Sequence, residues 1–204
     1  MHSPRFPFSR ESEAVRGAIP RLGIGWPVAV DPDLAIWRDY GCRGWPSLFL
    51  WGRGGALRWY HLGEGEYAAT EKAIRSALEE TGADASGWPA PLEPLRRSDA
   101  PGVLVASPTP ELFPGGGIDR PWAPTPADRS LSCDYEAAGA YATAAGQGKI
   151  AVRLDGDPLD PIAVDHPGLY ELAEHENHQR HRLELEVTPG VSIHSLQFAP
   201  GIRP

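Results

Sequence analysis

The sequence predicts an α/β N-terminal part followed by an all-β C-terminal part, and three observations support this division. Residues 1–82 show apolar residues at helical spacing on either side of a short hairpin pattern. Residues 102–204 instead alternate apolar and polar residues between glycine and proline turns. Residues 83–101 are dense in Pro, Gly, Ala and Ser, which is typical of a linker. We therefore expect two domains, 1–82 and 102–204, joined by the linker 83–101.

Composition and charge narrow the classes of function. The 204 residues suffice for one large or two small domains with real cores. A net charge of −8 argues against nonspecific binding to nucleic acid or to an anionic membrane. The sequence has neither a signal-peptide pattern nor an apolar run near the ~20 residues that span a bilayer. We expect a cytoplasmic location for the chain as given, or an extracytoplasmic one if an upstream segment exists.

The N-terminal part contains three helix patterns and one isolated strand pattern. Ser9 is expected to cap a helix over 10–22, which Pro20 should break or end early. Further helices are predicted over 34–40 and 66–80, and a short strand over 26–30.

Between the second and third helices lies a hairpin pattern that begins at Pro46. Proline cannot donate to a strand ladder but can open a strand, so we expect strands over 47–51 and 56–62 around the glycines of 52–55. An aromatic residue before proline also favours a cis bond, which we predict for Trp45–Pro46. The strand 47–51 is expected to have an unpaired edge.

The C-terminal part contains seven short β-like segments separated by turn residues. This pattern predicts an antiparallel sandwich. The segments are 103–106, 135–145, 149–154, 161–164, 169–173, 182–187 and 192–198.

Motifs across residues 2–80 resemble the soluble thioredoxin-like part of DipZ-type proteins. The matching stretches are His2 to Phe8, Trp26 to Asp31, Trp37 to Gly41, Trp45–Pro46 and His61 to Glu71. In this resemblance the hairpin and last helix form the second half of a thioredoxin fold. Thr109–Glu111, Leu154–Gly156 and Leu169–Leu172 resemble the carbohydrate-binding-module-like jelly roll that follows in the same proteins.

The resemblance implies a relative of thiol–disulfide oxidoreductases, and that chemistry requires Cys-x-x-Cys at a helix N-terminus. In the family this pair precedes the residues that match His2 to Phe8. We therefore assign no catalytic residue and expect the chain as given to be redox-inactive. We also expect an upstream start that restores the missing half of the fold.

Cys42 is the remaining redox candidate, because it lies four residues before Pro46 and Arg43 would favour its thiolate. The simpler interpretation is a small loop residue, since no resolving cysteine is nearby. Cys133 is interpreted as a core or edge residue. The substrate-binding candidates are Trp45 and Pro46, because the residue before this proline in thioredoxin folds presents its backbone to an extended peptide. The partner expected there is a thiol or disulfide protein; in the alternative interpretation the proline only positions the hairpin.

Three other patterns suggest ligands, but simpler interpretations are favoured for each. His175, His178 and His181 have metal-like spacing, yet the polar residues among them favour a solvated loop. Asp155-Gly156-Asp157 suggests calcium, yet Asp-Gly between strands is typical of a hairpin turn. Four aromatic residues suggest a sugar platform, but core filling is expected: Trp122, Tyr135, Tyr141 and Tyr170. We expect neither a metal nor a cofactor.

A second function class also fits the sequence. The C-terminal sandwich would then be a module that recognises a glycan or a protein, and the α/β part would only support it. The sequence leaves the ligand and the oligomeric state open.

Overall fold

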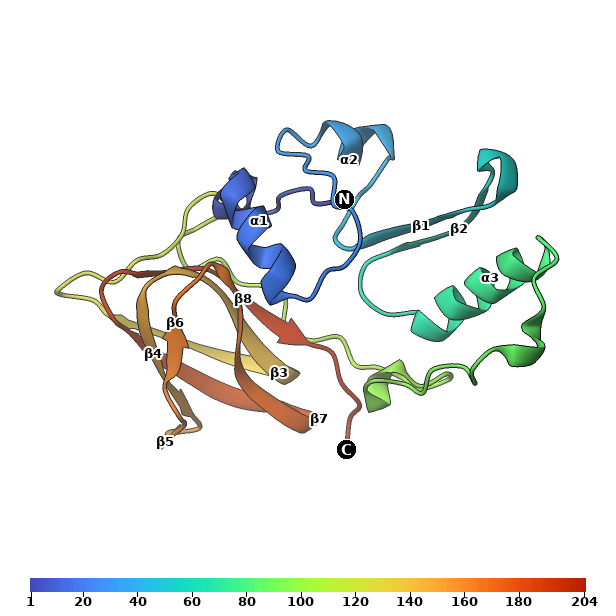
Figure 1. Cartoon of the computed structure of the whole chain (residues 1–204). Coiled ribbons are helices and arrows are strands. Elements are labelled where there is room, and N and C mark those ends of the chain that lie inside the picture. Colours follow the sequence, from blue (N-terminus) through green and yellow to red (C-terminus); the bar gives the residue numbers. More distant parts are fainter. The chain divides into compact units, whose positions relative to one another are not determined.

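The computed structural model describes all of residues 1–204, which form two compact units (Figure 1). The sandwich unit consists of Met1–Ile36 and Val105–Pro204, and the hairpin unit is Trp37–Leu104. This grouping differs from the predicted domains, because residues 1–36 pack with the C-terminal sandwich. The predicted linker 83–101 lies inside the hairpin unit.

Residues near the N-terminus join the sandwich through aromatic and charged contacts that sequence periodicity does not reveal. The rings of Phe6 and Phe8 meet His194 edge-on, with centroids 5.7 and 4.9 Å from it. The guanidinium of Arg5 forms an ion pair with Glu111. These contacts link positions about a hundred residues or more apart.

The sandwich unit is built on one six-stranded sheet in which the paired strands run antiparallel. The strand order is β5-β4-β7-β3-β8, and β6 also pairs with β4. A large antiparallel sheet with few helices fits the predicted β-sandwich. The strands are β3 (Ser130–Gly146), β4 (Gly148–Leu154), β5 (Asp157–Pro158), β6 (Ile162–Val164), β7 (Gly168–Val187) and β8 (Val191–Ala199).

The core of the protein lies in this sheet, where alternate residues point inward. Ile150, Leu183 and Ile193 are fully buried, and Tyr135 and Leu185 nearly so. The predicted turn at Asp155-Gly156 is confirmed: both residues have positive φ, and Leu154 pairs with Asp157 across it. Trp122 and Tyr170 pack against the core, which agrees with the core-filling interpretation.

The loop predicted at residues 175–181 is wrong, because β7 runs through it as a single strand. The register nevertheless breaks there: Glu174 pairs with Gly139 and Gln179 with Ala137. Residues 175–178 therefore stand opposite the single residue Ala138. Such a bulge preserves strand pairing on both sides and re-aims the side chains between them.

The helix α1 (Ser12–Arg21) is shorter at its start than predicted, and Ser9 does not cap it. The Ser9 hydroxyl instead donates to the Phe6 carbonyl at 2.8 Å, beside the short helix η1 (Pro7–Arg10). Pro20 lies in the last turn, one residue before the helix ends. The strand predicted over 26–30 is also wrong: only an isolated bridge joins Val30 to His2. No helix of the protein has both the length and the apolar character needed to cross a membrane.

The hairpin unit confirms the predicted hairpin and third helix. Strands β1 (Ser47–Trp51) and β2 (Leu57–Leu62) pair antiparallel around η2 (Arg53–Gly55), and α3 (Tyr67–Glu79) packs against β2 (Figure 1). The remaining helices are α2 (Ala35–Asp39), η3 (Ala85–Gly87) and η4 (Arg97–Asp99). The assignment of this part to a thioredoxin α/β fold stays a prediction.

The segment after α3 is held to that helix by hydrogen bonds. Glu71 accepts the backbone N–H of Leu92 at 2.9 Å and pairs with Arg75 at 2.6 Å. Arg75 also donates to the Pro89 carbonyl at 2.8 Å and lies over the ring of Trp88. Arg75 therefore connects α3 both to the Pro89 carbonyl and to the ring of Trp88.

Candidate functional site

The two predicted substrate-binding residues lie at the start of β1 and are accessible. The Trp45–Pro46 peptide bond is cis, the geometry predicted for it. Trp45 is 42% exposed and stacks on Trp37, with centroids 5.1 Å apart. The Pro46 carbonyl accepts the N–H of Gly63 at 2.8 Å, which fixes the loop to the end of β2.

The register of the hairpin determines which backbone N–H and C=O groups of β1 form no hydrogen bond with β2. Antiparallel partners alternate between hydrogen-bonded and non-hydrogen-bonded pairs. Because Pro46 and Gly63 form a bonded pair, Leu48 with His61 and Leu50 with Trp59 are bonded as well. The N–H and C=O groups of Ser47 and Phe49 therefore point away from β2. The register shifts between Leu50 and Trp51, but the N–H of Gly52 donates to the Ala56 carbonyl at 2.8 Å, so the groups of Trp51 also point away. β1 has no other strand partner, so this edge is open.

The open edge carries apolar side chains and none of the usual protection against pairing. The strand Ser-Leu-Phe-Leu-Trp contains no charge and no proline. Leu48 is 38% and Trp51 49% exposed. The ring of Tyr40 contacts Phe49 and Trp51 edge-on, with centroids 5.5 and 6.1 Å away. Exposed Arg43 and Arg53 lie just beyond the two ends of the strand.

The two cysteines are free and poorly placed for exchange chemistry. Cys42 is only 4% exposed, and its N–H donates to the Trp37 carbonyl at 3.0 Å. Cys133 is half-buried on β3, and burial raises the pKa of its thiol, with a smaller contribution from Asp134. Because the thiolate is the reactive form, a raised pKa slows attack at neutral pH.

The histidines of β7 do not converge on one point. His175 and His181 stack with centroids 3.9 Å apart; Nε2 of His175 lies 2.6 Å from the Tyr135 hydroxyl and Nδ1 of His181 2.7 Å from Asp155. His178 is buried elsewhere, with Nε2 3.6 Å from Glu136. No group of three or more His, Cys, Asp or Glu residues is arranged to hold a metal.

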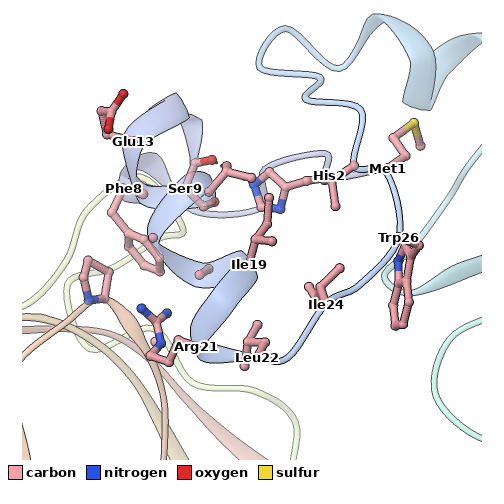
Figure 2. A pocket seen from close by; sticks show the side chains of 17 residues that line it. Met1, His2, Phe8, Ser9, Glu13, Ile19, Arg21, Leu22, Ile24 and Trp26 are labelled. Carbon is pink, nitrogen blue, oxygen red and sulfur yellow. Dashed lines mark hydrogen bonds between the residues drawn. The ribbon is translucent and has the colours of Figure 1, made fainter.

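A groove of about 500 Å³ lies beside α1 in the sandwich unit (Figure 2). Apolar side chains dominate its lining, among them Phe8, Ile19, Leu22 and Trp26. Leu22 and Trp26 are among the most exposed large apolar residues of this unit. The helical stripe at Val15, Ala18, Ile19 and Leu22 is the sequence signal that could have revealed it.

The sequence did not reveal two further arrangements. A polar groove of about 370 Å³ crosses three strands of the sandwich and is lined by Ser130, Ser132, Arg153, Glu184 and Glu186 among others. These side chains alternate with more buried ones along their strands, but only the strand order makes them neighbours. Likewise, only the hairpin register shows that Phe49 presents its backbone outward.

Comparison with known proteins gives one match to a protein family and several longer relatives. Residues 120–199 match the family described as thioredoxin like C-terminal domain. The protein DipZ of Mycobacterium bovis is 24% identical over 97% of this chain and 33% of its own length, so the chain spans about a third of that relative. The protein SUPPRESSOR OF QUENCHING 1, chloroplastic, of Arabidopsis thaliana is 29% identical over 56% of this chain and 11% of its own length.

A solved family two carbohydrate esterase from Clostridium thermocellum covers 41% of this chain and 28% of its own, with 19% identity and a TM-score of 0.32. A similarity this low carries no argument about function. The relationship to DipZ, in contrast, extends over nearly all of the chain, and the family match falls on the sandwich. The chain therefore resembles the protein DipZ over nearly all of its length, and its residues 120–199 match the thioredoxin like C-terminal domain.

Proposed function

We propose that residues 1–204 act as a thioredoxin-like binding module, related to thiol–disulfide oxidoreductases, that captures an extended protein segment along β1. One observation carries this proposal: Ser47, Phe49 and Trp51 direct unpaired N–H and C=O groups to the same open edge, beside exposed Trp45. An added strand satisfies these groups, while neighbouring side chains supply selectivity.

The module does not itself exchange disulfides. Cys42 is buried, and the raised thiol pKa of Cys133 disfavours its thiolate at neutral pH. Insulin reduction by dithiothreitol should proceed at the same rate with and without the protein. A rate increase that disappears on Cys42→Ala would contradict this part of the proposal.

Strand capture is tested by selecting a twelve-residue random peptide library on phage against the protein. Enriched peptides should bind the wild type and lose binding on Phe49→Pro, which removes an outward N–H without breaking the β1–β2 ladder. Tyr60→Pro is the matched control, because Tyr60 pairs with Phe49 and directs its N–H off the opposite edge. Phe49→Ala removes the ring but keeps the N–H, so it shows which of the two losses weakens binding in Phe49→Pro. Equal binding by all three variants would refute capture at β1.

A second candidate function is recognition of a ligand by the sandwich, and the polar groove on its outer face favours it. Glu184 and Glu186 on β7 and Arg153 on β4 present both charge signs there, next to serine hydroxyls. A glycan array probed with wild type and Glu186→Gln tests this role. Binding that is lost in the variant would support the groove, and the absence of any binding would remove the candidate.

A further inference from the structure

We propose that the bulge of β7 at residues 175–178 is a pH-sensitive switch, in which a second proton on the stacked pair of His175 and His181 opens the bulge and releases the segment that follows β8. This switch is separate from strand capture by β1, because all of the groups involved belong to the sandwich unit.

The bulge itself creates the close pair of histidines. Residues 175–178 stand opposite the single residue Ala138, so the distance along β7 between His175 and His181 is shortened. The two rings stack with centroids 3.9 Å apart and an interplanar angle of 23°. Two like charges this close repel each other, and partial burial of both rings weakens the screening by water. The stack is therefore compatible with one proton more than with two.

Asp155 stabilises a single proton on His181. This carboxylate lies in the turn after β4, with one oxygen 2.7 Å from Nδ1 of His181 and the other accepting the N–H of Arg182 at 2.7 Å. The opposite nitrogen of the ring, Nε2 of His181, is buried without a hydrogen-bond partner. Asp155 alone therefore offsets the charge of this ring by a hydrogen bond.

His175 is the ring on which the second proton is resisted. Burial, and after it the charge of His181, lowers the pKa of His175. The carboxylates of Asp155 and Glu174 act in the opposite direction with smaller effect. His175 therefore becomes charged only at acidic pH, when the ring stacked on it is already charged.

The groups that β3 and β8 place beside the pair carry no charge that could offset the second proton. The Tyr135 hydroxyl lies 2.6 Å from Nε2 of His175, and burial raises the pKa of this phenol. Burial also raises the pKa of the Cys133 thiol next to it on β3. From β8, the ring of Phe198 stacks on Tyr135 with centroids 4.9 Å apart. All three side chains are neutral at acidic pH, so repulsion within the pair is relieved by separating the rings.

The segment after β8 is held against the same bulge. The N–H of His178 donates to the Ile202 carbonyl at 2.8 Å. Gly201 packs so closely that an added Cβ would lie 2.3 Å from the Cβ of Ala138 and 3.4 Å from that of His178. Because His178 belongs to the bulge, separation of the stacked rings displaces the donor that holds this segment.

His178 also lowers the cost of opening. Its side chain is fully buried, and neither ring nitrogen has a hydrogen-bond partner; Nε2 lies 3.6 Å from the Glu136 carboxylate. A buried polar group without a partner is unfavourable, and exposure to water supplies the missing hydrogen bonds. The closed bulge is thus opposed by His178 at every pH, and the second proton on the stacked pair adds to this opposition.

Amide hydrogen exchange followed by NMR at pH 8 and pH 5 tests the switch, with each rate divided by that of an unstructured peptide at the same pH. The protection of the His178 amide should fall at least severalfold more than that of the Ile193 amide. Ile193 donates to the Trp122 carbonyl at 2.8 Å and reports on opening of the core. Equal changes at His178 and Ile193 would overturn the switch, because they would indicate global unfolding.

His175→Phe identifies the proton, because it keeps an aromatic ring in the stack but cannot be charged. Between pH 8 and pH 5 the protection of its His178 amide should change no more than that of Ile193. His166→Phe is the matched control, since His166 lies before β7 and pairs with Asp165, and it should behave as the wild type. A loss of protection that persists in His175→Phe would overturn the assignment to the stacked pair.

A measurement on the unmodified protein removes any dependence on how the variant folds. Histidine ring NMR signals followed from pH 8 to pH 5 should show His175 titrating at lower pH than His181. The loss of protection at His178 should follow the titration curve of His175. A loss that follows another histidine, or that precedes the titration of His175, would overturn the proposal.

Discussion

His175 and His181 stack with their ring centroids 3.9 Å apart, although six positions separate them on one strand. A regular strand would hold such residues about 20 Å apart at ~3.3 Å per residue. The bulge at residues 175–178 shortens the path and brings the rings together. Nε2 of His175 contacts the Tyr135 hydroxyl and Nδ1 of His181 contacts Asp155, so the two rings are held in a polar cluster beside the core.

We expect the stability of the sandwich to fall as the pH is lowered below the ordinary histidine pKa of about 6.5. Burial lowers the pKa of His194, and burial together with the charge of His181 lowers the pKa of His175. Below pH ~6.5 the unfolded chain therefore binds more protons than the folded protein. The folded protein loses stability as the pH falls from about 6.5 toward the lowered pKa values of His175 and His194.

Urea unfolding followed by circular dichroism between pH 8 and pH 5 measures this dependence. His194→Phe, which keeps an aromatic ring beside Phe6 and Phe8, should have a shallower dependence than the wild type. The comparison uses the change in unfolding free energy from pH 8 to pH 5 within each protein, which cancels any packing effect of the substitution. A variant as steep as the wild type would contradict the assignment to His194.

Truncation of the buried core should cost far more stability than truncation at the surface. Ile193 on β8 is fully buried, so Ile193→Ala should lower the free energy of unfolding by about 2–5 kcal/mol. The control is Leu169→Ala on β7, where the side chain is 58% exposed and a change within about 0.5 kcal/mol is expected. Chemical denaturation of both variants checks the difference, and equal losses would mean that the sheet does not bury Ile193.

Two glycine substitutions should have opposite effects. Gly146 has φ of 106°, and an added Cβ would lie 1.9 Å from the Gly190 carbonyl oxygen, so Gly146→Ala should cost more than about 1 kcal/mol. Gly17 lies inside α1 with open space around it, so Gly17→Ala should stabilise by about 0.5–1 kcal/mol. Thermal denaturation of the pair gives the signs. The same sign for both would contradict the described backbone at one of the sites.

Removal of the Glu71 carboxylate should release the segment after α3. Glu71→Ala deletes the acceptor of the Leu92 N–H and the partner of Arg75. The loss of this hydrogen bond and this ion pair predicts severalfold faster cleavage in the segment. Limited trypsin digestion at Arg96 and Arg97 measures the rate, with exposed Glu79→Ala on the same helix as the control. Unchanged cleavage in Glu71→Ala would show that the anchor is unimportant.

Local patterns predicted the elements whose residues contact their near neighbours in the chain. The glycines after Trp51 and the apolar stretches around them predicted the hairpin, and the helical spacing from Tyr67 predicted α3. The same reasoning failed at residues 26–30, because an apolar stretch forms a strand only where a partner strand is available. It also failed at 175–181. The bulge there redirects the side chains, so polar residues are tolerated within the strand.

The candidate site could be predicted only in part. Trp45, Pro46 and the unpaired edge of β1 follow from local sequence, because a proline-opened strand with one hairpin partner leaves one edge free. The choice of Phe49 as a residue with outward groups could not be predicted, because it depends on the bonded pair between Pro46 and Gly63. The packing of Phe6 and Phe8 on His194 was equally inaccessible, since no local pattern connects positions so far apart.

The grouping of residues 1–36 with residues 105–204 has a consequence for synthesis on the ribosome. Phe6 and Phe8 cannot contact their packing partner His194 until the residues between them have been translated. At ~5–20 residues per second, that delay is on the order of ten to forty seconds. The hairpin unit is continuous in sequence and is complete before the sandwich strands appear. We therefore expect nascent chains arrested beyond residue 104 to protect α3 from protease while Phe6 and Phe8 are still exposed to chaperones.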